Sequence, residues 1–163
     1  MPFSPWPTDP GDAAWVDIVT RAADRASAAV AAIPPDERGT EVGRGKGGDT
    51  TLVIDRDAEA AIVEVLEQAH ADGLRFDLIS EELGTRSFDG DGVLVVVDPI
   101  DGTRAYIRGD DIWCVSIAVV SGGIPVAGVL ACPARNEFFE AQCDGAALKN
   151  GERIQVSAEL SGG

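Results

Sequence analysis

The chain has 163 residues, of which 45% are hydrophobic, and a formal net charge of −15. This length and hydrophobic fraction suffice for one folded domain with a core and argue against a disordered chain. The acidic charge argues against a nucleic-acid partner, and no apolar run approaches the roughly 20 residues of a membrane span. An anionic substrate would be repelled unless cations separated it from the carboxylates, so the charge favours a divalent-metal enzyme. Acidity that only aids solubility is the open alternative.

Two helices are predicted in the first half of the chain. Residues 1–12 carry four prolines and are expected to form an irregular lead-in that ends with Asp12 as a helix N-cap. This lead-in lacks the basic and apolar regions of a signal peptide, so a cytoplasmic protein is expected. Apolar residues at helical spacing predict one helix over Trp15–Ile33, ended by Pro34 and Pro35. They predict a second over Ala58–Ala69, followed by Gly73 as its C′ residue.

After Gly73 the hydrophobic pattern changes to that of strands. The continuous apolar run Val93–Val97 is typical of a strand covered on both faces. Short turn sequences separate the later strands, which indicates an antiparallel arrangement. The predicted strands are residues 76–79, 93–97, 113–120, 124–132 and 137–143. The predicted fold class is therefore α+β, with two N-terminal helices packed on a largely antiparallel β-sheet.

Sulfur and imidazole chemistry are not expected to carry the function. The three cysteines, Cys114, Cys132 and Cys143, are odd in number and scattered, which fits neither a disulfide framework nor a zinc cluster. Buried reduced thiols are the expectation for them. His70 is the only histidine and lies on the second predicted helix as a boundary or surface residue. No histidine-based nucleophile relay is predicted.

The segment Asp98–Thr103 is the strongest candidate for chemistry. Asp98 follows the apolar run, and Pro99, which lacks an N–H, should turn the chain so that Asp101 faces the same side. That turn would also expose the Ile100 carbonyl. The segment thus offers oxygen ligands for hard divalent cations, and Gly102 and Thr103 could open a short helix whose N–H groups face an anion. An ordinary Asp-rich turn is the alternative interpretation.

Two further acidic positions could complete such a site. Glu81 and Glu82 follow the predicted strand at residues 76–79, so Glu81 falls beside Asp98 if the two strands are neighbours. Asp98 would then be the carboxylate that bridges a pair of metal ions. Asp55 precedes the second helix, where it could be an N-cap or could hold the Thr103 hydroxyl so that both orient a water molecule. A solvated acidic turn at Glu81 and Glu82 is the alternative.

A glycine-rich segment precedes the second helix. Gly43–Gly48 superficially resembles a nucleotide-binding loop, but it lacks the P-loop spacing and a preceding strand. A mobile loop near the site is the preferred interpretation, in which Lys46 could help neutralise phosphate.

Together these residues resemble the inositol monophosphatase superfamily of metal-dependent, lithium-sensitive phosphatases. The resemblance covers about residues 13 to 160, and the glycine-rich loop looks closest to the archaeal-type inositol monophosphatases and fructose-1,6-bisphosphatases. The matching segments are Ile54–Glu59, Ile79–Gly84, Val97–Thr103, Val115–Ala118 and Asn150–Ser157.

This resemblance implies two or three Mg²⁺ ions. By position, Glu81, Asp98 and the Ile100 carbonyl would bind the first ion, and Asp98 with Asp101 would bind the second. The fold implied is the first half of the αβαβα sugar-phosphatase sandwich.

The resemblance also implies catalytic and substrate-binding roles. Asp55, Thr103 and Glu81 would be the catalytic residues, with Thr103 and Asp55 activating the attacking water. Asp101, Gly102 and Thr103 would bind the substrate, the last two through backbone groups on the phosphate. The implied reaction is hydrolysis of a phosphate monoester, inositol 1-phosphate or fructose 1,6-bisphosphate, and a homodimer is also implied.

The sequence departs from the family pattern in its extent. Family members continue into a second α/β domain with a Trp-Asp motif whose aspartate completes the second metal site, and no Trp-Asp pair occurs in this chain. Residues 13–163 would then be the N-terminal metal-binding domain, without the C-terminal domain. Little turnover is expected from such a chain. Alternative functions are a 3′(2′),5′-bisphosphate nucleotidase, a histidinol-phosphatase, or a non-catalytic module that binds metal or phosphate.

Overall fold

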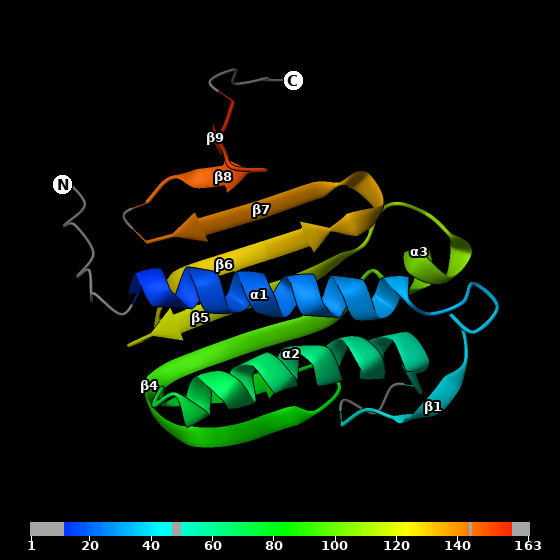
Figure 1. Cartoon of the computed structure of the whole chain (residues 1–163), viewed down its shortest axis with the longest axis horizontal. Helices are drawn as coiled ribbons and strands as arrows, with labels where there is room; N and C mark the ends of the chain where they lie inside the picture. The colour runs from blue at the N-terminus through cyan, green and yellow to red at the C-terminus, as the bar shows by residue number, and fades with distance from the viewer. Residues whose placement is uncertain (1–11, 47–49, 144, 158–163) are drawn as a thin grey trace, which may run out of the picture.

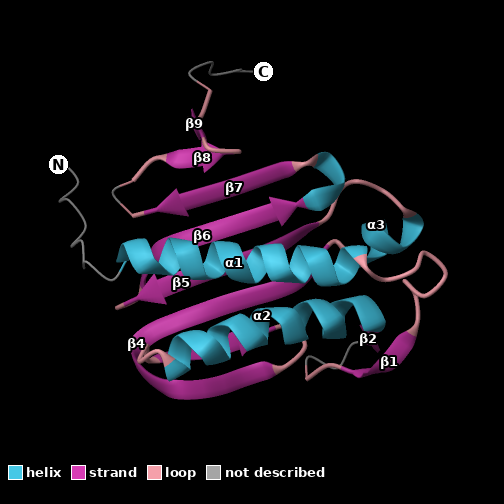
Figure 2. Cartoon of the chain, in the orientation of Figure 1, coloured by secondary structure: helices cyan, strands magenta, loops and turns pink. Residues whose placement is uncertain are grey.

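Two helices cover one face of a seven-stranded β-sheet in the computed structural model, which describes residues 12–46, 50–143 and 145–157. Helices α1 (Asp12–Ala31) and α2 (Val53–Ala71) lie side by side on that face (Figure 1). A short helix, α3 (Thr103–Arg108), and a small hairpin of β1 (Glu41–Arg44) and β2 (Thr50–Leu52) lie at one end of the sheet (Figure 2). The predicted α+β class is confirmed.

Both predicted helices are present with different ends. Helix α1 begins at Asp12, three residues before the predicted start, and ends at Ala31. It stops two residues short of Ile33, which precedes Pro34 and is disfavoured in helical conformation. Helix α2 begins at Val53, five residues before its apolar face becomes regular. Residues 1–11 of the predicted lead-in lie outside the described residues. Only the backbone of Asp12 is described, so its predicted role as the side-chain N-cap of α1 is not tested.

The sheet places its strands in chain order, and every neighbouring pair from β4–β5 onward is antiparallel. A single turn of 3₁₀-helix, η1 (Pro133–Arg135), forms one of the predicted hairpin connections. The strands are β3 (Phe76–Ser80), β4 (Gly84–Asp101), β5 (Cys114–Ser121), β6 (Ile124–Cys132), β7 (Glu137–Gln142), β8 (Ala147–Lys149) and β9 (Glu152–Ile154).

Strand β4 doubles back on itself (Figure 1), and β3 pairs with both of its halves and so lies between them. Ile79 of β3 is opposite both Thr85 in the first half and Val96 in the second. The register runs in opposite directions in the two halves, so the first half is antiparallel to β3 and the second half is parallel to it. Only the apolar second half was predicted, because residues 84–89 are mostly polar and follow directly from a turn.

Alternation along the strands divides the sheet into a buried and an open face. Leu78, Val95 and Val97 are at most 4% exposed and pack under the helices with the aromatic rings of Trp15 and Phe76. The residues that alternate with them on the other face are exposed apolar side chains: Ile79, Val96 and Leu130. The prediction that the strand Val93–Val97 is covered on both faces is therefore wrong. In the described part of the chain, α1 and α2 cover one face of the sheet and the other face is open.

Among the described residues, no helix combines the length and apolar character that crossing a membrane would require.

Candidate metal and phosphate site

Four carboxylates from three separate elements form an acidic cluster: Asp55, Glu81, Asp98 and Asp101. Glu81 follows β3, and its N–H donates a hydrogen bond to the Val97 carbonyl of β4 at 3.2 Å. Since these parts of β3 and β4 run parallel, their carboxyl ends meet at the same edge of the sheet. Ser80 pairs with Val97, so Glu81 falls beside Asp98, as expected for neighbouring strands.

A β-bulge at Pro99 and Ile100 separates Asp98 from Asp101 in β4. Asp98 pairs with Ser116 and Asp101 with Cys114, so three steps along β4 match two steps along β5. Such a bulge holds one extra residue and tolerates a proline, which has no N–H for the ladder. The prediction that the strand ends at Asp98 is therefore wrong, and it continues to Asp101. The bulge nevertheless keeps the two carboxylates close enough for the charge of Asp101 to act on Asp98.

Asp55 is buried in the first turn of α2 and is not its N-cap, which is Leu52. Its Oδ2 atom accepts the Leu52 N–H at 3.3 Å, and its Oδ1 atom lies 3.4 Å from the Thr103 hydroxyl oxygen. The Thr103 hydroxyl also lies 2.9 Å from the Ile100 carbonyl. Because a hydroxyl has one proton, the shorter bond to Ile100 is the stronger, and the contact with Asp55 is the weaker one.

Burial is the main reason that the pKa of Asp55 is raised. Loss of solvation raises the pKa of Asp55 to about 6, and the charges of Glu82 and Glu81 act in the same direction. The Leu52 N–H opposes this rise by stabilising the ionised form. Asp55 is thus a carboxylate whose protonation changes close to neutral pH.

Asp98 combines an elevated pKa with an oxygen that lacks a partner. Burial is the first cause that raises the pKa of Asp98, and the charges of Asp101 and Asp55 add to it. The Glu81 side chain and the Ile100 N–H partly oppose the rise in the pKa of Asp98. The Oδ1 atom of Asp98 is buried and accepts no hydrogen bond. A buried acceptor without a donor is costly, and a cation at that position would remove the cost.

The chemistry of the acidic cluster fits a hard divalent cation, although its arrangement is not already that of a metal cage. Carboxylate oxygens are the ligands that Mg²⁺ prefers. Within residues 12–46, 50–143 and 145–157, no three His, Cys, Asp or Glu side chains stand at metal-ligating positions.

Comparison with known proteins identifies the family of the chain. The model of the inositol monophosphatase family matches residues 13–161. The chain belongs to the inositol monophosphatase family. It is 31% identical over 147 residues to the inositol-1-monophosphatase of Synechocystis sp., covering 90% of this chain and 50% of the relative. It is 37% identical over 132 residues to the fructose-1,6-bisphosphatase/inositol-1-monophosphatase of Archaeoglobus fulgidus, covering 79% of this chain and 49% of the relative.

Solved structures agree with this family assignment. The crystal structure of the extragenic suppressor protein suhB from Bartonella henselae superposes with a TM-score of 0.77 at 31% identity. The superposition covers 90% of this chain and 55% of that one. The chain therefore spans about half the length of the relatives it matches.

Two residues of this inositol monophosphatase family member support the acidic cluster and were given no role from the sequence. Glu59 accepts hydrogen bonds from the Ser80 hydroxyl and from the Leu83 N–H, the latter at 2.8 Å, and so fixes the turn that carries Glu81. Thr51 donates its hydroxyl to Glu82. The signal for Glu59 was its position four residues after Asp55, which places both on one face of α2.

Lys46 belongs to the connection between β1 and β2, for which the glycine-rich sequence predicts a loop. Its N–H donates to the Glu82 carbonyl at 3.1 Å, and its side chain covers Gly84. Residues 47–49 lie outside the described residues. Lys46 is therefore fixed to the turn after β3, next to the acidic cluster.

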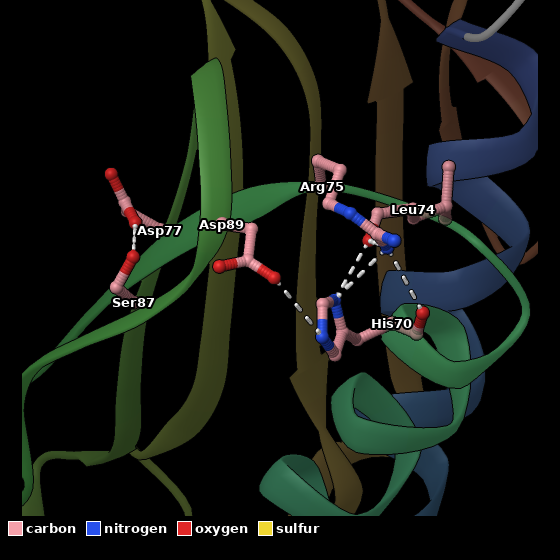
Figure 3. Close-up of polar contacts among 6 residues, drawn as sticks. All are labelled: His70, Leu74, Arg75, Asp77, Ser87 and Asp89. Atoms are coloured by element: carbon pink, nitrogen blue, oxygen red, sulfur yellow. Dashed lines mark hydrogen bonds and ion pairs between the residues drawn. The ribbon is translucent and has the colours of Figure 1, made fainter.

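His70 takes no part in the acidic cluster, as the sequence analysis expected. It lies near the end of α2, fifteen residues from Asp55, which corresponds to about 22 Å along a helix. Figure 3 shows its ring between Leu74 and Asp89, with Nδ1 3.0 Å from the Leu74 carbonyl oxygen and Nε2 3.8 Å from Asp89 Oδ2. These contacts join the end of α2 to the bend in β4.

Gly102 allows the chain to pass from the bulge into α3, which begins at Thr103 as predicted. It adopts φ 95°, and a Cβ atom there would lie 2.8 Å from the Ile112 carbonyl oxygen. We expect Gly102→Ala to lower the free energy of unfolding by about 2 kcal/mol or more, from left-handed strain plus this backbone clash. Gly109→Ala is the matched control, because Gly109 has φ 78° with nothing within 4 Å of a Cβ atom. It should cost about 1 kcal/mol in urea unfolding. Equal losses would show that the contact with Ile112 does not matter.

Proposed function

We propose that this chain carries the metal-binding and water-activating part of a magnesium-dependent phosphomonoesterase. The substrates proposed are inositol 1-phosphate and fructose 1,6-bisphosphate, in line with the names of the two relatives. The observation that carries the proposal is the buried Asp98 Oδ1 atom without a partner at the centre of the acidic cluster. A solvated acidic turn, the alternative interpretation, would leave no such atom.

The proposed magnesium ligands are Glu81, Asp98, the Ile100 carbonyl and Asp101. Bound magnesium would supply positive charge that stabilises the charge developing on the phosphate and on the leaving alkoxide. The Ile100 carbonyl now accepts the Thr103 hydroxyl, a hydrogen bond that would be exchanged for the one to Asp55 when magnesium and substrate are bound. Two or three ions remain the proposed number.

Asp55 and Thr103 are the proposed pair that holds and removes the proton of the attacking water. Thr103 would accept a hydrogen bond from the water while donating its own proton to Asp55, in a contact now 3.4 Å long that would shorten with substrate present. With its pKa raised to about 6, Asp55 can accept a proton more readily than an ordinary aspartate. Asp101, Gly102 and Thr103 are the proposed contacts of the phosphate.

The proposal extends to the parts of the relatives that this chain does not span. A second domain would cover the open apolar face of the sheet, where Ile79, Val96 and Leu130 are exposed. Removing these side chains from water would stabilise that contact. A homodimer, a cytoplasmic location and sensitivity to lithium belong to the same proposal.

Magnesium titration by calorimetry and phosphate release on the 163-residue chain test the proposal together. Magnesium binding with phosphate release that stops in EDTA would support it. Because little turnover is expected from this chain, even slow release counts for the enzyme, and magnesium binding with no release from any substrate above the EDTA background would favour a non-catalytic binding module instead. Absence of magnesium binding would contradict both. A panel of inositol 1-phosphate, fructose 1,6-bisphosphate, histidinol phosphate and a nucleoside 3′,5′-bisphosphate distinguishes the enzymatic alternatives.

A further inference from the structure

We propose that Cys114 and Cys132 form a modification site, a dithiol that closes reversibly to a disulfide. Strands β5 and β6 are antiparallel with Val115 opposite Ala131, so one step further along both strands Cys114 lies opposite Cys132. Directly opposed residues of antiparallel strands have Cα atoms about 4.5–5.5 Å apart, within the roughly 4.4–6.8 Å that a disulfide spans. Burial raises the pKa of both thiols, so little thiolate is present and exchange with a disulfide is slow.

The dithiol is accessible and lies at the edge of the acidic cluster. Both cysteines are free and only half-buried, which corrects the prediction of buried thiols. They alternate with the buried residues Val115 and Ala131, so they belong to the face of the sheet away from α1 and α2. On its other side, Cys114 pairs with Asp101.

Cys143 is too distant to compete for either thiol. Its N–H donates to the Val126 carbonyl at 2.8 Å, which places it beside β6 six residues before Cys132. Six residues of a strand span about 20 Å. The pairing is therefore specific to Cys114 and Cys132, although the spacing in the sequence gave no sign of it.

The reaction requires an oxidant, which we take to be a small-molecule disulfide. The thiolate of one cysteine attacks a sulfur of the oxidant, which forms a mixed disulfide and releases one small thiol. The thiolate of the second cysteine then attacks the first cysteine's sulfur and releases the second small thiol. Two protein thiols are oxidised, one small disulfide is reduced to two thiols, and the two thiol protons pass to the leaving groups.

Peptide mapping after equilibration with oxidised glutathione tests the site. Trypsin cleaves after Arg108 and Arg135, so residues 109–135 form one peptide with both cysteines, and Cys143 lies in residues 136–149. After alkylation of free thiols, we expect the first peptide to be lighter by two hydrogen atoms and to carry no alkyl group. Recovery of that peptide with two alkylated or glutathione-bound cysteines would overturn the proposal.

Two controls separate folded geometry from chance pairing. Cys143→Ser should still form the disulfide, whereas Cys114→Ser should leave Cys132 alkylated or glutathione-bound. The equilibrium should favour the disulfide at least about tenfold more in the folded chain than in urea, because the register of β5 and β6 holds the two cysteines opposite each other. Equal disulfide formation in urea, or loss of the disulfide in Cys143→Ser, would contradict it. None of these measurements depends on phosphatase activity.

Discussion

Asp98→Asn is expected to weaken magnesium binding by about 100-fold or more and at the same time to stabilise the magnesium-free chain. Asparagine keeps the size of aspartate but has no charge to attract a cation. Losing several kcal/mol of interaction with the metal lowers magnesium affinity by about 100-fold or more, and the rate of phosphate release should fall as the metal is lost. Without magnesium, the charge of Asp98 is disfavoured by burial and by Asp101, so its removal relieves the folded state. A gain of about 1 kcal/mol would raise the melting temperature by about 2–4 °C.

Calorimetric titration and thermal unfolding in EDTA measure these two effects. Asp89→Asn is the matched control, because Asp89 is an exposed aspartate at the bend of β4, far from the acidic cluster. It should change neither magnesium affinity nor, beyond about 0.5 kcal/mol, stability. Retention of magnesium affinity in Asp98→Asn would remove Asp98 from the metal site. If Asp98→Asn instead melted at a lower temperature than the unmodified chain in EDTA, the charge of Asp98 would not destabilise the magnesium-free fold.

Local chemistry explains why most of the fold could be predicted from the sequence. The apolar faces of α1 and α2 follow helical spacing, and the strands from β5 to β7 are separated by short turns, so their existence is determined by nearby residues. The first half of β4 was missed because its pairing depends on β3 and on a bend, which is tertiary information. The hairpin of β1 and β2 was missed for the same reason, since its glycine-rich sequence is typical of a loop.

The site could be predicted as a set of residues but not as a geometry. The unusual residue types of Asp98–Thr103 pointed to oxygen chemistry, and the pairing of β3 with β4 then placed Glu81 beside Asp98. The bulge at Pro99, which replaces the predicted turn, depends on the register with β5. Glu59 and the opposed pair Cys114 and Cys132 become visible only when separate elements are brought together.

The magnesium-free chain is expected to be more stable at pH 5 than at pH 7.5, with Asp55 as a main cause. The pKa of Asp55 is raised from 3.8 in the unfolded chain to about 6 in the folded one, so the folded state holds more protons between these values. The resulting stabilisation is complete below pH 3.8 and is lost as the pH rises through about 6. A shift of about two units corresponds to at most about 3 kcal/mol. The elevated pKa of Asp98 acts in the same direction.

Asp55→Asn isolates this contribution, because it removes the titrating group while leaving an oxygen for the Leu52 N–H. Urea unfolding in EDTA should show the variant to be more stable than the unmodified chain at pH 7.5, with the difference shrinking toward pH 5. The reverse trend, or a difference independent of pH, would mean that Asp55 is ionised in the folded chain at little cost. Saturating magnesium should reduce the difference at pH 7.5, since added positive charge in the acidic cluster stabilises the ionised form of Asp55.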